Sequence, residues 1–291
     1  MNKQIKNFLV GMIAVLLLSS CHFMQKKAEF SNLGSSKRGL ASLFNSVLFV
    51  NIPAGSFEMG DFNKKVPVEI TRTFQMMETE VTQKQWSSVM RYNPSYFNKP
   101  EYCDNYDWFG TLEGKVEMCP DNPVENVSYS EVQEFISKIN ENTGELCSSK
   151  ELRRKNSGCL RLPTEAEWEY SVRANTHPYI DYFFGNDPLL LNTYAVYSKN
   201  SKQSQKVRSK KKNPWGLYDM YGNVWEYVQD TWSESLPGGT DPLFIREHFY
   251  GYVIRGGSYY SLNESLKSSS RFMAYPEGKS KYIGFRLVRT L

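Results

Sequence analysis

Alternating apolar and polar positions predict two strands where the folded part of the chain begins. Val66, Val68 and Ile70 recur at every second position, which is typical of a strand with one buried face. We therefore predict a strand over residues 66–77. Residues 48–59 form the other predicted strand, with a turn at the Pro-Ala-Gly sequence inside it.

Capping boxes mark the starts of three predicted helices. In a capping box, a Ser or Thr and a Glu or Gln three residues later satisfy free N–H groups of the first helical turn. The chain has such pairs at Thr82 and Gln85, at Ser128 and Glu131, and at Thr164 and Glu167. The first helix should end before the Asn-Pro sequence at residues 93–94. The acids that open the third helix, Glu165 and Glu167, are interpreted as caps only.

The remaining pattern sets the fold class. A short strand is predicted at residues 160–162, and beyond the third helix the sequence predicts turns, short strands and many aromatic side chains. It contains no long helix and no internal repeat. We predict an α+β domain with few helices and long irregular loops.

The N-terminus resembles an export signal. Lys3 and Lys6 precede the almost wholly apolar segment 8–18, which is shorter than the about 20 residues that span a bilayer but fits a signal peptide. The residues ending at Cys21 resemble the lipobox of bacterial lipoproteins, in which the Cys thiol is diacylated. The alternative is an ordinary secretory signal with a chance Cys. His22 is not the Asp that retains many lipoproteins at the inner membrane, which points to the outer membrane.

These features divide the chain and predict its disulfides. We expect a signal peptide (1–20), a tether after the lipid (21–48) and one domain (49–291). Export implies an oxidising compartment, where the four other Cys allow three pairings. The simplest pairing is local, Cys103 with Cys119 and Cys147 with Cys159, and each bond would stabilise the fold by about 3 kcal/mol. The polar stretch around the second pair predicts a surface staple, with a catalytic pair as the alternative.

Composition excludes some functions. The net charge is +4, too small to indicate nucleic acid binding. The three His residues, His22, His177 and His248, lie far apart in the sequence, which argues against a His-based metal site or a Ser-His-Asp triad. Aromatic residues make up 14% of the chain, which suits a loop-rich fold better than a helix bundle.

An ordered series of short motifs covers most of the predicted domain. The motifs are FEMG from Phe57, EVTQKQW from Glu80, NPVENVS from Asn122, RLPTEAEWEY from Arg161, WGLYDMYGNVWEY from Trp215, RGGS from Arg255 and GFRL from Gly284. The ordered set resembles the formylglycine-generating enzyme (sulfatase-modifying factor) family. This resemblance implies a C-type-lectin-like fold for residues 49–291.

The resemblance also implies one calcium site. The side chains of Asp219 and Glu226 and the carbonyls of Gly222 and Val224 would bind the ion, and calcium prefers such oxygen ligands. The alternative is that these acids only satisfy backbone N–H groups. A second calcium loop of the family is poorly matched, because Asn192 is followed by the basic segment 198–212. We interpret that segment as a solvated loop, with contact to anionic lipid or glycan as the weaker alternative.

The family's catalytic residues are missing. The family enzyme oxidises a substrate Cys with oxygen, using copper(I) held by two Cys that lie five positions apart after the RGGS motif. Thiolates suit copper(I), but Ser261 and Leu266 stand at these positions. Copper is therefore not expected, and formylglycine formation by the copper mechanism is not predicted. Substitution by the pair Cys147 and Cys159 is the alternative.

The family's cleft holds an extended peptide, and aromatic and Arg side chains would line it here. The predicted residues are Trp225, Tyr259, Tyr260, Arg271 and Arg286. Aromatic walls with a few polar groups are typical of binding sites, and equally of a core in a Tyr-rich protein. We expect a membrane-anchored, non-catalytic module that binds a peptide, protein or glycan, or that assembles the envelope. The alternative is an oxidoreductase of the same family that acts on a peptide or protein without copper.

Overall fold

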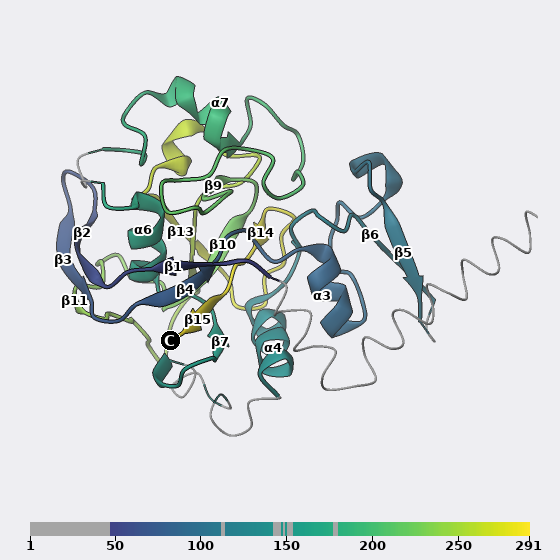
Figure 1. Cartoon of the computed structure of the whole chain (residues 1–291), viewed down its shortest axis with the longest axis horizontal. Helices are drawn as coiled ribbons and strands as arrows, with labels where there is room; N and C mark the ends of the chain where they lie inside the picture. Colours follow the sequence, from purple (N-terminus) through teal and green to yellow (C-terminus); the bar gives the residue numbers. More distant parts are fainter. Residues whose placement is uncertain (1–46, 112–113, 142–146, 148, 150–153, 177–179) are drawn as a thin grey trace, which may run out of the picture.

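The computed structural model describes the chain from residue 47 to its end (Figure 1), except for residues 112–113, 142–146, 148, 150–153 and 177–179. The predicted signal peptide, Cys21 and nearly all of the predicted tether lie outside the described residues. No helix in the described part is long and apolar enough to cross a membrane.

Two four-stranded sheets form the centre of the domain. The first has all neighbours antiparallel and contains, in order, β1 (Phe49–Ile52), β4 (Phe74–Met77), β15 (Val288–Thr290) and β7 (Leu160–Arg161). The second contains β13 (Arg271–Ala274), β12 (Tyr252–Arg255), β10 (Trp225–Thr231) and β14 (Ile283–Gly284). In it only the β10–β14 pair is parallel. Because β15 lies between β4 and β7, the last strand ties the start of the domain to its middle.

Three smaller strand groups surround this centre. They are the sheet of β11 (Gly239–Thr240), β3 (Lys65–Ile70) and β2 (Gly55–Gly60), the hairpin of β5 (Asp107–Gly110) and β6 (Lys115–Met118), and the pair β8 (Ala195–Val196) and β9 (Tyr221–Gly222). The β5–β6 hairpin projects from the rest of the domain (Figure 1). The sequence pattern did not predict it.

The predicted strands exist, but each is divided between two sheets. Residues 48–59 form β1 and β2, which separate at the predicted Pro-Ala-Gly turn. Residues 66–77, predicted as one strand, form β3 and β4, so that prediction was wrong in its extent. The exposed residues 71–73 turn the chain, and Phe74 then pairs with Ile52 in the other sheet.

All three predicted helices are confirmed with their capping boxes. They are α3 (Gln83–Met90), α4 (Tyr129–Asn140) and α6 (Glu165–Arg173). The other short helical segments are η1 (Pro100–Tyr102), η3 (Pro188–Leu190), α7 (Leu191–Tyr194) and η4 (Asn263–Leu266). Short strands with few helices confirm the α+β class.

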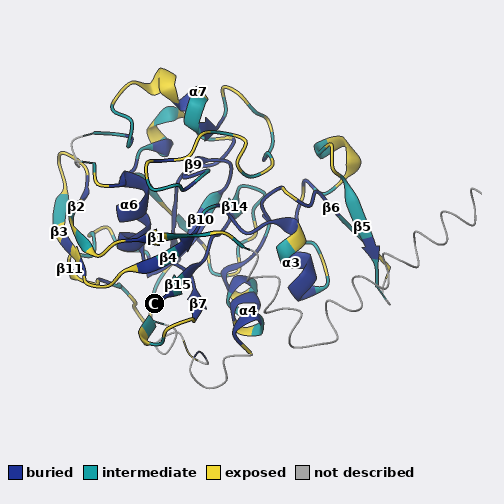
Figure 2. Cartoon of the chain, viewed as in Figure 1, coloured by how far each residue is buried: buried dark blue, intermediate teal, exposed yellow. Residues whose placement is uncertain are grey.

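Buried side chains form two main clusters, one around α6 and one between α3, α4 and the sheets. Figure 2 marks α6 and most of β10 as buried. In the second cluster Trp86 of α3 stacks on Phe135 of α4, with ring centroids 5.1 Å apart and planes at 5°. Every residue of α6 is buried, although four of its nine residues are Glu or Arg. Charges this deeply buried must be paired.

Both predicted local disulfides are confirmed, Cys103–Cys119 and Cys147–Cys159. The predicted surface position of the second was wrong, because Cys147 is 1% and Cys159 0% exposed. Cys159 directly precedes β7, whose two residues are both buried, so this bond is anchored in the interior.

Candidate binding site

The buried charges of α6 form a chain of ion pairs. Glu169 accepts hydrogen bonds from Arg173 Nε at 2.9 Å and from the Gly60 N–H at 2.8 Å, and it also pairs with Arg255. Arg255 Nε lies 3.4 Å from Glu165 of the same helix. Glu165 was predicted to act only as a cap, and that prediction was incomplete, since its carboxylate is a member of this network.

Arg271, predicted to line the cleft, ends the same network. Its Nε and Nη2 lie 2.7 and 2.6 Å from the two oxygens of Glu165. Its guanidinium also lies 4.7 Å from the ring centroid of Trp232. Arg271 is therefore a half-buried structural partner of α6 in this structure and is not a free anchor for a ligand.

Arg286, the other predicted anchor, is fully buried and forms a two-pronged ion pair with Glu226. Both bonds, Nε to Oε2 and Nη2 to Oε1, are 2.7 Å long. Trp168 Nε1 donates a third hydrogen bond to Glu226 at 2.7 Å. Because Arg286 is 0% exposed, it does not reach an open cleft.

The other predicted calcium ligands, Asp219, Gly222 and Val224, are buried as well. Asp219 adopts a left-handed backbone conformation and accepts a hydrogen bond from the Arg208 N–H at 2.7 Å. Burial raises the pKa of Asp219 to about 6. Glu80, which the sequence did not single out, is buried beside it, and burial raises the pKa of Glu80 well above its usual range.

This arrangement does not fit the predicted calcium ligands as they stand. Glu226 already has both oxygens bonded to Arg286, so an ion would have to displace that guanidinium. No three His, Cys, Asp or Glu side chains converge as metal ligands in the described part of the chain. At the poorly matched second loop, Lys210 Nζ lies 2.9 Å from the carbonyl oxygen of Asn192 and brings a positive charge there. Calcium stays a prediction.

The two positions that hold copper in the family contain ordinary structural side chains. Ser261 Oγ accepts a hydrogen bond from the Ser258 N–H at 2.9 Å. Leu266 is fully buried in the core around α6. It lies so close to Gly257 that a Cβ on this glycine would meet Leu266 Cδ2 at 2.4 Å. Leucine thus fills this position with an apolar group in contact with the protein core.

Seven aromatic residues, two of them directly before Ser261 in the chain, form two groups of touching rings, one of five and one of two. This aromatic face consists of Tyr96, Phe97, Trp225, Tyr259, Tyr260, Phe272 and Tyr282. Ring centroids lie 5.0 to 6.2 Å apart along the contacts Tyr96–Phe97, Phe97–Tyr259, Tyr259–Tyr282, Tyr260–Tyr282 and Trp225–Phe272. The Trp225 N–H donates to the Tyr282 carbonyl at 2.7 Å and joins the two halves.

The aromatic face has a buried floor and exposed rings. Tyr259 is 1% exposed and forms the floor, whereas Tyr260 is 67% and Phe272 63% exposed. Of the five predicted cleft residues, Trp225, Tyr259 and Tyr260 therefore lie together, and Arg271 and Arg286 do not join them. The sequence had no periodic signal for Tyr96 and Tyr282, because both lie in irregular segments.

Lys281 adds a positive charge to the aromatic face, with Nζ 4.7 Å from the Tyr96 ring centroid. Behind Tyr259, Glu125 accepts a hydrogen bond from the Phe97 N–H at 2.9 Å. Burial raises the pKa of Glu125 to about 8. This raised pKa favours the neutral form of Glu125, so its carboxyl group does little to offset the positive charge of Lys281.

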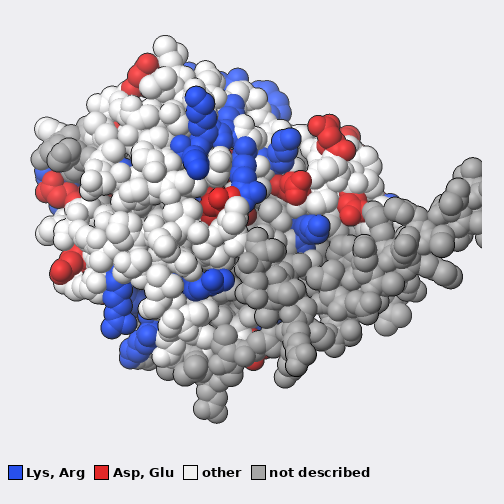
Figure 3. Space-filling model, in the orientation of Figure 1, with Lys and Arg blue, Asp and Glu red and all other residues white. Residues whose placement is uncertain are grey.

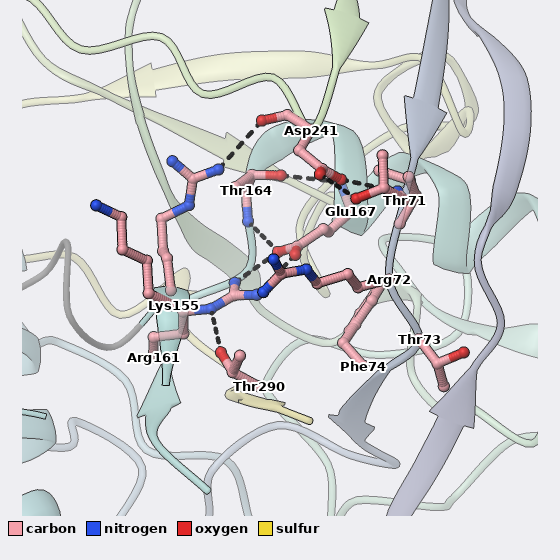
Figure 4. Close-up of a pocket in the computed structure, with 12 residues that line it drawn as sticks. Thr71, Arg72, Thr73, Phe74, Lys155, Arg161, Thr164, Glu167, Asp241 and Thr290 are labelled. Atoms are coloured by element: carbon pink, nitrogen blue, oxygen red, sulfur yellow. Dashed lines mark hydrogen bonds and ion pairs between the residues drawn. The ribbon is translucent and has the colours of Figure 1, made fainter. Parts of the chain in front are cut away.

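A separate charged cavity of about 280 Å³ lies next to the start of α6 (Figure 4). Four of its charged side chains form hydrogen bonds with other residues that line it, and one of these contacts, Arg161 with Glu167, is an ion pair. Arg161 binds Glu167 at 2.6 and 2.7 Å, and Arg154 donates to the Asp241 carbonyl at 3.1 Å. Asp241 in turn accepts from the Thr71 N–H at 2.9 Å. We therefore interpret this cavity as structural and the aromatic face as the candidate binding site.

Comparison with solved structures supports the fold. Treponema denticola variable protein 1 is 26% identical with a TM-score of 0.69, and the match covers 84% of this chain and 95% of that one. PvdO from Pseudomonas aeruginosa is 22% identical with a TM-score of 0.65, covering 84% and 94%. The second likeness is one of fold alone.

Sequence relatives have diverse names. The chaperone protein LppX of Paenibacillus barcinonensis is 29% identical over 57% of this chain and 69% of its own length. Serine/threonine-protein kinase pkn1 of Chlamydia pneumoniae is 31% identical over 45% of this chain, and only 21% of the kinase is matched. Inactive C-alpha-formylglycine-generating enzyme 2 of Mus musculus is 30% identical over 43% of this chain and 42% of its own length.

The match to one protein family spans nearly all of the folded chain. The model of the sulfatase-modifying factor enzyme 1-like domain matches residues 44–291, and the sequence motifs predicted a domain over 49–291. This match includes both central sheets, the α6 ion pairs and the aromatic face. With the fold shared by the solved neighbours, it establishes that this chain belongs to the sulfatase-modifying factor enzyme 1-like family.

Proposed function

We propose that this protein is a lipid-anchored, non-catalytic member of its family that binds an extended peptide segment on the aromatic face. The observation that carries this proposal is the set of exposed rings, Tyr96, Tyr260 and Phe272, each in contact with another ring of the aromatic face. Large exposed apolar groups that touch one another mark interaction sites more often than isolated ones do.

The position of β13 favours a peptide over a glycan. β13 carries Phe272 and lies at the edge of its sheet among the described strands. An edge strand offers backbone N–H and C=O groups to an incoming extended chain. Phe272 and Trp225, 6.2 Å apart, would then contact side chains of that peptide. The name of the Paenibacillus relative, a chaperone protein, also supports binding to polypeptides.

The non-catalytic part of the proposal rests on Ser261 and Leu266. Neither side chain supplies a thiolate, and Leu266 is packed into the core. The mouse relative, named as an inactive formylglycine-generating enzyme, supports the view that members of this family persist without that activity. An oxidoreductase would need metal ligands elsewhere in the chain, and oxygen uptake with bound copper or iron would support it.

Peptide selection on the purified domain tests the binding site. The protein would be screened against a displayed library of random peptides, and the affinity of selected peptides would be measured by calorimetry. We expect Y260A and F272A each to weaken binding at least tenfold, as removal of a central aromatic contact does. Y250A is the matched control, because Tyr250 is 82% exposed and no described ring contact joins it to the aromatic face. Equal affinity for all three variants would refute the site.

The lipid anchor on Cys21 has its own test. We propose that the mature chain is diacylated there and exposed in the envelope, at the outer membrane where the cell has one. Cells would be labelled with a palmitate analogue, and the protein would be followed through membrane fractionation. C21A should lose the label and leave the membrane fraction. A labelled C21A protein would rule out this anchor.

A further inference from the structure

We propose that the basic loop, residues 198–212, docks on anionic phospholipid headgroups of the membrane to which the chain is anchored. This inference rests on the lipid anchoring proposed above and adds a second contact with the same bilayer. The loop lies within the connection between β8 and β9. Between residues 199 and 212 it has no Asp or Glu and seven cations, Lys199, Lys202, Lys206, Arg208, Lys210, Lys211 and Lys212.

The backbone of the basic loop is fixed at several points. The Gln205 N–H donates to Asn223 Oδ1 at 2.9 Å, the Val207 N–H to the Asp121 carbonyl at 2.9 Å, and the Lys211 N–H to the Thr193 carbonyl at 3.0 Å. Ser204 is fully buried. The backbone that carries the cations is therefore held in place, and docking would cost little backbone entropy.

Most of these charges have no acid to neutralise them. Arg208 pairs with Glu78, Lys210 donates to a carbonyl, and Lys212 lies 6.0 Å from the Tyr218 ring centroid. The ammonium groups of the other four Lys residues form no hydrogen bond or ion pair with a described residue. These residues are Lys199, Lys202, Lys206 and Lys211. Figure 3 shows Lys and Arg side chains gathered on the upper part of one face. Such a cluster attracts the anionic headgroups of a bilayer.

The basic loop also lies where the tether enters the domain. Val47 and Leu48, at the start of the described chain, line a cavity of about 320 Å³ together with Val207 and Arg208 of the loop. The chain that follows Cys21 therefore enters the described domain beside the basic loop. A lipid chain combined with a basic cluster is a pairing that gives stable membrane attachment. The bilayer is thus favoured over free phosphate or a polyanion in solution.

Vesicle flotation of the non-lipidated chain tests the docking separately from the anchor. Residues 22–291 contain every described element, so the fold is retained without the acyl chains. We expect this protein to bind vesicles with 30 mol% phosphatidylglycerol in phosphatidylcholine at 50 mM salt, and to be released at 500 mM salt. In the quadruple variant K199Q/K202Q/K206Q/K211Q, the partition coefficient onto these vesicles should fall at least on the order of a hundredfold, because four basic residues are lost at an anionic surface.

A variant with the same net charge provides the control. K64Q/K99Q/K138Q/K279Q removes four surface cations outside the loop and should bind almost as the unchanged protein does. Equal loss in both variants, or equal binding to vesicles of phosphatidylcholine alone, would overturn the proposal. So would displacement from the vesicles by 10 mM inorganic phosphate or by an equal charge of polyphosphate. Since Cys21 is absent, failure here would leave the palmitate experiment and the anchor unaffected.

Discussion

Glu169 holds two of the buried Arg side chains in place, so E169Q should strongly destabilise the domain. The substitution keeps the size of the side chain and removes one negative charge. Arg173 would then lose its ion pair with Glu169, and Arg255 would keep only its contact with Glu165, which it shares with Arg271. Both Arg173 and Arg255 have side chains no more than 2% exposed, so water cannot replace the lost partner.

The geometry sets the size of the effect. Glu169 and its two Arg partners are almost fully desolvated, and removal of one partner from a buried ion pair costs about 3 to 5 kcal/mol. A surface pair gives the contrast, since Glu58 and Lys65 lie 3.3 Å apart with side chains 46% and 29% exposed. E58Q should therefore cost less than about 1 kcal/mol. A domain of ordinary stability has about 5 to 15 kcal/mol in total, so E169Q should fold with a much reduced margin.

Urea unfolding followed by tryptophan fluorescence measures both variants under oxidising conditions. The change in midpoint at constant slope gives the change in free energy of unfolding. The double variant E169Q/R173Q should cost less than the sum of its two single changes, because it removes both charges of one contact. A loss below about 1 kcal/mol in E169Q, or strict additivity in the double variant, would refute the reasoning that this network is a desolvated set of charges.

Three further predictions concern acidity, disulfides and metal. Burial raises the pKa of Glu125 from 4.5 to about 8. Between these two pH values the folded state keeps a proton on Glu125 that the unfolded state loses. The free energy of unfolding should therefore fall as the pH rises from about 4.5 to about 8. E125Q removes this pH dependence, so the urea midpoint of E125Q minus that of the unchanged protein should be larger at pH 8 than at pH 5. The same difference at both pH values would contradict the raised pKa of Glu125. Replacing Cys103 and Cys119 by Ser opens a 16-residue connection and should lower the free energy of unfolding by about 3 kcal/mol, measured by the same unfolding curves. EDTA should shift the melting temperature by less than about 2 °C, because Arg286 already supplies the counter-charge to Glu226 that calcium would give; a larger fall that added calcium reverses would restore the predicted calcium site.

The sequence predicted the parts of the fold that short-range interactions determine. Each helix start was readable because a capping box joins residues only three positions apart, as at Thr82 and Gln85. The local disulfides were readable for a similar reason. The division of residues 66–77 between two sheets could not be predicted in this way, because the pairing of Phe74 with Ile52 joins strands that are not neighbours in the sequence.

The candidate site was only partly predictable for the same physical reason. Trp225, Tyr259 and Tyr260 were proposed from motifs and are joined in space through Tyr282, a contact that no spacing in sequence encodes. Arg271 and Arg286 were assigned to the cleft because a free Arg often anchors a ligand. Their carboxylate partners, Glu165 and Glu226, lie 106 and 60 positions away, so their burial could not be read from the chain.

The residues that identify the family are largely those that hold its charged interior together. Arg255 of the RGGS motif pairs with Glu169, and Arg286 of the GFRL motif pairs with Glu226. Gly257 is required where it stands, because its φ is 79° and Leu266 leaves no room for a Cβ. These contacts keep their structural role whether or not copper ligands follow the motif. Membership of this family therefore specifies the architecture of the chain, whereas its activity depends on residues outside these contacts, among them those at positions 261 and 266.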